Sequence, residues 1–143
     1  MGGVHLVAGS AYFSWDEPDS VASLHRQFAV VDTRKGVHGH IRVDYWEEFL
    51  GDIYETTFVV SADCLDVEEE TGEAWIGGEV VRVTGDFPTL GEKFVFYVDD
   101  NNGGNPLNPD IHGSYWGPPD YTCDERPAPW FPDPSQRGKI IVK

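Results

Sequence analysis

Apolar and polar residues alternate along most of this chain, with the period of two that is typical of half-buried β-strands. The stretch Val37–Trp46 is an example, because Ile41 and Val43 alternate with polar neighbours. No window of about 11 residues sustains the i, i+3, i+4, i+7 apolar spacing of an amphipathic helix. The sequence therefore predicts an all-β fold.

The alternating segments predict eight strands, separated by turn residues at hairpin spacing. The strands cover Val4–Trp15, Leu24–Thr33, Val37–Trp46, Ile53–Val67, Ala74–Val83, Lys93–Val98, Ile111–Trp116 and Lys139–Val142. We place Phe28 and Val30 on one face of the second strand. We expect a bulge near Ser61, and the Gly77-Gly78 pair marks a bulge or a close approach of backbones.

The connections between these strands contain no helical crossovers, so a parallel sheet is disfavoured. We expect an antiparallel barrel or sandwich of about eight strands, with a Pro-rich C-terminal loop. Residues 1–143 form a single β domain in this interpretation. Residues 1–22 are its N-terminal strand and linker, and residues 117–137 are the Pro-rich loop, since proline cannot donate to a strand ladder.

Charge restricts the partners of the domain. The chain has 143 residues, with 25 acidic and 10 basic side chains and a net charge of −15. This charge repels phosphate backbones and anionic lipid surfaces, so we expect no nucleic-acid partner. No apolar run approaches the roughly 18 residues that a membrane span needs. The length suits one domain with a real hydrophobic core.

The two cysteines, Cys64 and Cys123, leave two interpretations open from the residues alone. They are either buried thiols of a cytosolic protein or a single disulfide in an oxidising compartment. Only four lysines, strong acidity and many Asn, Gly and Pro residues fit a secreted, extracellular protein better. The chain shows no signal peptide, and Met1-Gly2-Gly3 looks like a start placed before a mature domain, so we expect a removed leader.

Short motifs follow one another in a characteristic order from residue 62 onward. They are Ala62-Asp63-Cys64-Leu65, Ala74-Trp75-Ile76-Gly77-Gly78, Phe94-Val95-Phe96-Tyr97-Val98-Asp99-Asp100 with an Asn/Gly loop, a late Cys123, and a closing Arg137–Val142. This order resembles a loose family of secreted bacterial β-domains of unknown function, over about residues 23 to 143. The family usually has one Asp less where this chain has Asp99 and Asp100.

The resemblance implies secretion, a β-barrel-like fold and a pair of cysteines, and it brings no known activity and no catalytic residues. Together with the even cysteine count and the extracellular composition, it predicts a disulfide between Cys64 and Cys123. The bond would pin the Pro-rich loop onto the sheet. It would close a loop of about 60 residues, which the chain-entropy treatment values at roughly 4 kcal/mol.

One candidate metal site consists of His38 and His40. They alternate on one predicted strand, so both rings project to the same side and could share a metal ion with a ligand from a neighbouring strand. The other interpretation is two solvent-facing imidazoles beside Arg42, because Val37, Ile41 and Val43 already supply the buried face.

The polar loop Asp99–Asp110 is a second candidate metal site, for calcium. Calcium binds oxygen ligands, and this loop supplies them in abundance. We single out Asp99, Asp100, Asn102 and Asp110. The alternative is a turn cluster in which Asn and Asp side chains bond their own backbone.

Aromatic residues are more numerous than a small core needs, so some of them should line a pocket or an exposed patch. The candidates for ligand or surface binding are Trp15, Tyr45, Trp46, Tyr115, Trp116 and Trp130. Tryptophan and tyrosine suit carbohydrate stacking, apolar ligands and protein contacts alike. The alternative is that they cap the ends of the barrel and hold the Pro-rich loop.

We therefore interpret the protein as a non-enzymatic, secreted domain for extracellular binding or self-assembly. It would hold a carbohydrate or apolar ligand, or form a homo-oligomer or filament through strand edges, with Val4–Trp15 completing a neighbour's sheet. The alternative is a small β-barrel enzyme acting on such a ligand in an internal pocket. A cavity of about 300 Å³ or more with a buried ionisable group would favour the enzyme, and a filled core would favour binding or assembly.

Overall fold

The computed structural model describes residues 5–85, 87–100, 111–116, 121–134 and 140–142, the side chains of 130–134 excepted. The elements are β1 (His5–Glu17), β2 (Ser20–Thr33), β3 (Gly36–Phe49), β4 (Asp52–Glu68), β5 (Glu73–Thr84), β6 (Lys93–Asp99), β7 (Ile111–Trp116), the 3-10 turn η1 (Cys123–Glu125), β8 (Trp130–Pro134) and β9 (Ile140–Val142). Within these ranges, no helix has the length and apolar character that a membrane crossing requires.

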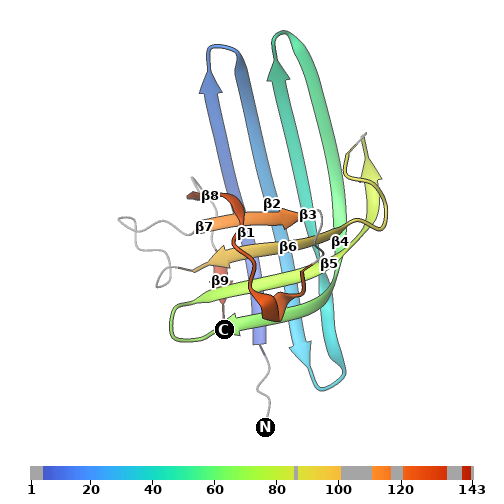
Figure 1. The fold of residues 1–143 in the computed structure, drawn as a ribbon, viewed down its shortest axis with the longest axis vertical. Helices are drawn as coiled ribbons and strands as arrows, with labels where there is room; N and C mark the ends of the chain where they lie inside the picture. Colours follow the sequence, from blue (N-terminus) through green and yellow to red (C-terminus); the bar gives the residue numbers. More distant parts are fainter. Residues whose placement is uncertain (1–4, 86, 101–110, 117–120, 135–139, 143) are drawn as a thin grey trace.

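All nine strands belong to one antiparallel sheet, in the order β8-β7-β6-β5-β4-β3-β2-β1-β9. In Figure 1, β1, β2 and β3 run side by side as long strands, while β5, β6 and β7 cross in front of them. The sheet thus curls over itself into a half-barrel, and β9 returns to pair with β1. The predicted all-β, antiparallel and barrel-like fold is confirmed.

The predicted segments correspond to real strands, and several strands extend further than the alternation indicated. β1 turns through Pro18 and Asp19 directly into β2, so the segment predicted as a linker within residues 1–22 is a tight hairpin. Register shifts between Val59 and Val60 and between Ala62 and Cys64 flank Ser61, where the bulge was expected.

The strand β8 was not predicted, because it lies inside the Pro-rich segment. It pairs with β7 at the edge of the sheet. Edge strands tolerate proline, since the missing N–H can face away from the neighbouring strand. The predicted Pro-rich loop therefore contributes one strand to the sheet.

The hydrophobic core fills the inner, concave side of the curl. The residues that build it are alternate positions of the strands, as the period of two requires. Those with at most 1% exposure include Val7, Val30, Ile41, Val60, Ile76, Phe96, Val98 and Ile140. The phenylalanine rings of Phe94 and Phe96 stack at 5.6 Å between centroids, and Phe58 packs 5.2 Å from Phe94.

The disulfide lies on the outer side of the sheet. Cys64 and Cys123 are bonded, with their Cα atoms 5.9 Å apart, which confirms the predicted pairing. Opposite them, a Cβ atom on Gly77 would lie 2.9 Å from the sulfur of Cys123 and closer still to that of Cys64. On Gly78 it would lie 2.7 Å from a side-chain carbon of Val60. The glycine pair therefore marks two close approaches, as its position in a strand indicated.

Candidate functional site

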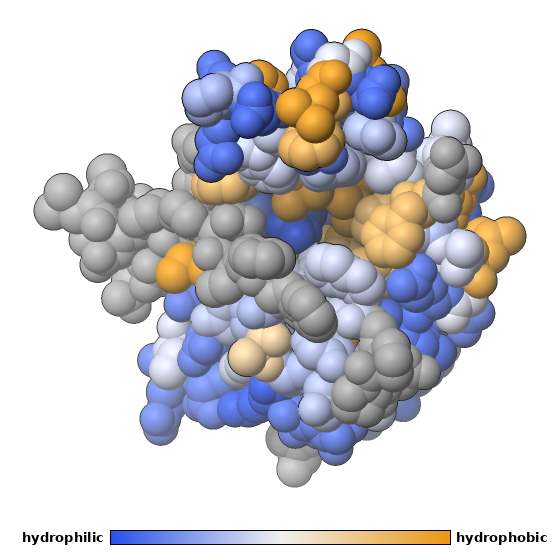
Figure 2. Space-filling model, turned by 45° about the horizontal axis from the view of Figure 1, so that its top comes forward, coloured by the Kyte–Doolittle hydropathy of each residue, from blue (hydrophilic) through white to orange (hydrophobic). Residues whose placement is uncertain are grey.

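A pocket of about 750 Å³ opens at the end of the half-barrel nearest the β1–β2 and β3–β4 hairpin tips, beyond the filled core. Figure 2 looks into this hollow beneath the hairpin tips, where orange hydrophobic surface borders a blue hydrophilic patch. Aromatic rings dominate the wall. The lining residues are Phe13, Trp15, Glu17, Leu24, Arg26, Val43, Tyr45, Thr56, Phe58, Phe87, Phe94, Ser114 and Trp116.

Strand register brings one side of this wall together. Phe13 on β1 lies opposite Leu24 on β2, and Leu24 lies opposite Tyr45 on β3. Because paired residues of neighbouring strands point to the same face, these three side chains form a continuous row. The Trp15 ring lies 5.9 Å from that of Phe13 and 6.5 Å from that of Tyr45, so the wall is largely aromatic.

The opposite wall comes from the strands that cross in front. Trp116, at the end of β7, stacks on Phe94 of β6 at 5.8 Å. Phe87, from the segment between β5 and β6, lies 6.5 Å from Trp116 and is 50% exposed. Two separate parts of the chain thus face each other across the pocket.

A polar cluster lies at the deep end of the pocket. Arg26 is only 7% exposed, and its Nη2 donates a hydrogen bond of 2.8 Å to Ser114 Oγ. Its Nη1 donates to Nδ1 of the fully buried His112. Because a guanidinium can only donate, Nδ1 of His112 must accept, and the ring proton of the neutral imidazole therefore sits on Nε2.

The ionisable groups around the pocket are held in defined charge states. Burial, and then the positive charge of Arg26, lower the pKa of His112 to about 3, so this imidazole is neutral at physiological pH. Burial and the neighbouring Glu47 raise the pKa of Tyr45 to about 12, which keeps its phenol protonated. The deep end therefore contains a permanent cation beside a neutral histidine and a hydroxyl.

The mouth of the pocket has acidic character instead. Trp15 Nε1 donates a hydrogen bond of 3.2 Å to Ser20 Oγ. The Ser20 hydroxyl in turn donates a hydrogen bond of 3.4 Å to Glu47 Oε2. These bonds tie the ring of Trp15 to the hairpin on which Glu47 lies. Glu17 supplies a carboxylate to the lining itself.

The structure places the six predicted aromatic residues in different locations. Trp15, Tyr45 and Trp116 line the pocket. Trp46 follows Tyr45 on β3, so it projects from the opposite face. Tyr115 packs on the outer side, 4.9 Å from Tyr121. The side chain of Trp130 lies outside the described part of the structure.

Sequence reasoning missed the phenylalanines of the pocket and, above all, Arg26. A signal for Arg26 was present, because residues 26, 28 and 30 are alternate positions of β2 and therefore share one face. Phe28 and Val30 had already been assigned to that face. A charged residue on a buried face of a strand is unusual, and such residues often have a function.

The predicted metal ligands do not assemble in the described residues. His38 and His40 lie exposed on β3, and no group of three or more His, Cys, Asp or Glu in the described ranges could hold a metal ion. The Asp100 carboxylate accepts a hydrogen bond of 3.0 Å from Val142 N, so it fastens β9. Asn102 and Asp110 lie outside the described residues, and calcium binding stays a prediction.

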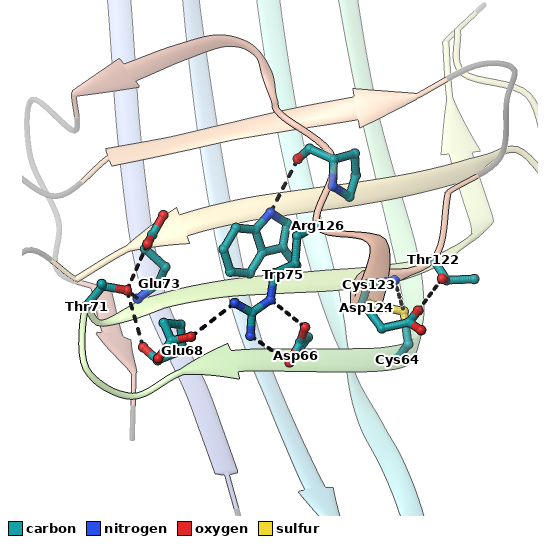
Figure 3. Close-up of polar contacts among 11 residues, drawn as sticks. Cys64, Asp66, Glu68, Thr71, Glu73, Trp75, Thr122, Cys123, Asp124 and Arg126 are labelled. Carbon is teal, nitrogen blue, oxygen red and sulfur yellow. Dashed lines mark hydrogen bonds and ion pairs between the residues drawn. A yellow bond between two sulfur atoms is a disulfide. The ribbon is translucent and has the colours of Figure 1, made fainter.

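A second arginine–aromatic cluster lies on the outer side, near the disulfide (Figure 3). The Arg126 guanidinium stacks 4.8 Å from the ring centroid of Trp75. Its Nε and Nη2 donate to the two carboxylate oxygens of Asp66 at 2.7 and 3.2 Å, and its Nη1 donates to Glu68 at 3.1 Å. Trp75 Nε1 donates to the carbonyl oxygen of Pro127 at 3.3 Å. These polar contacts hold the C-terminal segment on the sheet.

Comparison with models of protein families, with curated proteins and with solved structures gave no match for this chain. The functional inference therefore rests on the pocket itself.

The pocket is large enough for an active site and contains a buried ionisable group, which are the two features expected of an enzyme. However, its ionisable groups are poorly suited to proton transfer. Arg26 remains protonated in proteins and acts neither as acid nor as base. His112 has a pKa of about 3 and no exposed surface, far from the range useful for general acid–base catalysis near neutral pH. Glu17 is exposed at the mouth. The arrangement is suited to holding a ligand.

Proposed function

We propose that this protein is a non-enzymatic binding domain that takes an apolar small molecule into the aromatic pocket below its hairpin tips. The supporting observation is a pocket of about 750 Å³ whose walls are mostly aromatic and aliphatic. Ligand sites commonly have volumes of about 300–1,000 Å³ and the same mixture of apolar walls with few polar groups. Covering these rings with a ligand would remove apolar surface from water, which is favourable.

The lining favours an apolar ligand over a carbohydrate. A sugar needs polar partners around its whole ring, because its buried hydroxyl groups must be hydrogen-bonded. Few polar residues line this pocket, and the rings of Phe13, Phe58 and Phe94 are part of its wall. Self-assembly through strand edges is a separate prediction, which a solution mass compared with 16.0 kDa would test.

We also propose that the domain works outside the cell. The Cys64–Cys123 disulfide supports this location, because such bonds persist in oxidising compartments and are rare in the cytosol. The resemblance to a family of secreted bacterial β-domains agrees with it. Mass spectrometry of the protein from its native source, with free thiols alkylated, would contradict the proposal if both cysteines were modified.

The pocket can be tested with Nile red, a neutral apolar dye whose fluorescence rises in apolar surroundings. We expect saturable binding to the wild-type protein and a strong loss of affinity in Tyr45→Ala. Trp46→Ala is the matched control, because it removes the next ring along β3 but from the opposite face. Retained binding in Tyr45→Ala, or an equal loss in folded Trp46→Ala, would exclude the pocket as the site.

A further inference from the structure

The polar cluster at the deep end of the pocket indicates the chemical class of the ligand, on the basis of the binding function proposed above. We propose that the ligand is an amphipathic carboxylate, an apolar chain or ring system with one terminal acid group. The carboxylate binds the Arg26 guanidinium and the Ser114 hydroxyl, and the apolar part lies against the aromatic walls.

Arg26 has the geometry that a carboxylate requires. Its guanidinium carries five N–H donors in one plane, which suits bidentate binding of a carboxylate. It lines the pocket while being 7% exposed, so it meets a ligand in surroundings of low dielectric constant. Opposite charges attract far more strongly there than in water.

His112 is the positioning residue for this guanidinium. Its Nδ1 accepts a hydrogen bond from Arg26 Nη1, and the ring is fully buried behind the pocket wall. Because the imidazole is neutral, it fixes the orientation of Arg26 without cancelling its charge. An acidic residue in the same place would fix the guanidinium but also neutralise it.

Ser114 adds a second recognition group. Its Oγ accepts a hydrogen bond of 2.8 Å from Arg26 Nη2 and lines the pocket. A hydroxyl that accepts one bond still has its own proton to donate, and a carboxylate can only accept. Arg26 and Ser114 therefore present donors side by side to an anionic group.

The distribution of charge also predicts the orientation of the ligand. Glu17 lies at the mouth, whereas Arg26 lies at the deep end, so a carboxylate is repelled at the entrance and attracted inside. The net charge of −15 disfavours anions over the whole molecule. A preference for an anion must consequently come from the local site.

Three probes with straight chains of ten carbons separate the chemistries: decanoate, decan-1-ol and decyltrimethylammonium, titrated calorimetrically at neutral pH. We expect decanoate to bind at least about tenfold more tightly than decanol, since hydrogen bonds between charged groups are the strong ones. Arg26→Gln should weaken decanoate about tenfold or more and weaken decanol much less, because the hydroxyl of decanol makes only a hydrogen bond without charge on the ligand. Arg126→Gln, the same substitution on the outer face, should change neither.

Each outcome decides a different part of the inference. Equal affinities for decanoate and decanol, unaffected by Arg26→Gln, would overturn the carboxylate site and leave the apolar pocket standing. Tighter binding of the cation would also overturn it. Failure of all three probes and of Nile red would overturn the binding function as well. If Arg26→Gln does not fold, Ser114→Ala must weaken decanoate severalfold more than it weakens decanol.

Discussion

Arg126 on the outer face of the sheet and Arg26 on the inner face both lie among aromatic side chains, but their polar contacts differ. Arg126 stacks on Trp75 and bonds to the carboxylates of Asp66 and Glu68. Arg26 is buried and bonds to the neutral side chains of His112 and Ser114. Arg126 is thus paired with negative charges of the chain. His112 and Ser114 orient the guanidinium of Arg26, but neither of them carries a negative charge.

The aromatic residues of the two regions differ in the same way. The indole of Trp75 is covered by the C-terminal segment and donates to Pro127 O. The rings of Trp15, Tyr45 and Trp116 line an open volume of about 750 Å³. An aromatic cluster that the chain itself covers is a structural element, whereas one that the described part of the chain leaves open is a candidate for a ligand. The predictions below test this distinction.

Removal of the disulfide should have the largest effect on stability and little effect on the pocket. The bond joins residues 59 apart in sequence, and for such a loop the chain-entropy treatment gives about 4 kcal/mol. We expect Cys64→Ser/Cys123→Ser to lose about this much free energy of unfolding in urea. Nile red affinity should stay at the wild-type value while the variant is folded. Loss of dye binding in the folded variant would show that the outer region supports the pocket.

Gly77→Ala should reveal how tightly the outer region is packed. A Cβ atom there would meet both sulfur atoms, so we expect a loss of up to about 3 kcal/mol, as for overpacked cores. In a Cys64→Ala/Cys123→Ala background the sulfur atoms are gone, and the cost should shrink. A double-mutant cycle measured by chemical unfolding gives the coupling. If Gly77→Ala costs the same free energy of unfolding in both backgrounds, the disulfide is not the reason why residue 77 must be glycine.

The sequence predicted the outer region better than the pocket. The glycine pair has a strong local signal, because a close approach of backbones depends on the residue type. The Cys64–Cys123 pairing followed from the even cysteine count, the extracellular composition and the family resemblance together. The period of two likewise revealed the strands. The pocket depends on how far the sheet curls and on which strands cross, and these follow from long-range packing that alternation does not encode.

The partial success with the aromatic residues illustrates the same limit. Tyr45 and Trp46 are adjacent, and composition alone selected both as ligand-binding candidates. The alternation of side chains along a strand shows that Tyr45 and Trp46 lie on opposite faces. Which of the two faces lines the pocket depends on how the sheet curls. Phe87 lies outside the predicted strands, so no pattern connected it with Trp116, which it faces in the folded protein.

Acid should destabilise the inner region through His112. Its pKa of about 3 in the folded protein lies below its unfolded value of about 6.5, so between these pH values the unfolded state binds more protons. Stability is therefore lost as pH falls below about 6.5, by about 2 kcal/mol at pH 5. Urea unfolding at several pH values should show this loss, and His112→Gln should lack it. An identical pH dependence in both proteins would rule out His112 as its source.

Neutralisation of Arg126 should have the smallest effect, although this residue forms ion pairs with both Asp66 and Glu68. Its hydrogen bonds to Asp66 and Glu68 raise its pKa, but its side chain is 36% exposed, and water and salt screen such pairs. We expect Arg126→Gln to lower the thermal midpoint slightly at low ionic strength and to be indistinguishable from wild type at high salt. Gln keeps part of the stacking on Trp75, so the comparison isolates the charge. A large decrease of the thermal midpoint that persists in high salt would mean that the ion pairs of Arg126 are not screened and behave like those of a buried group. The contrast between Arg126 and Arg26 would then fail.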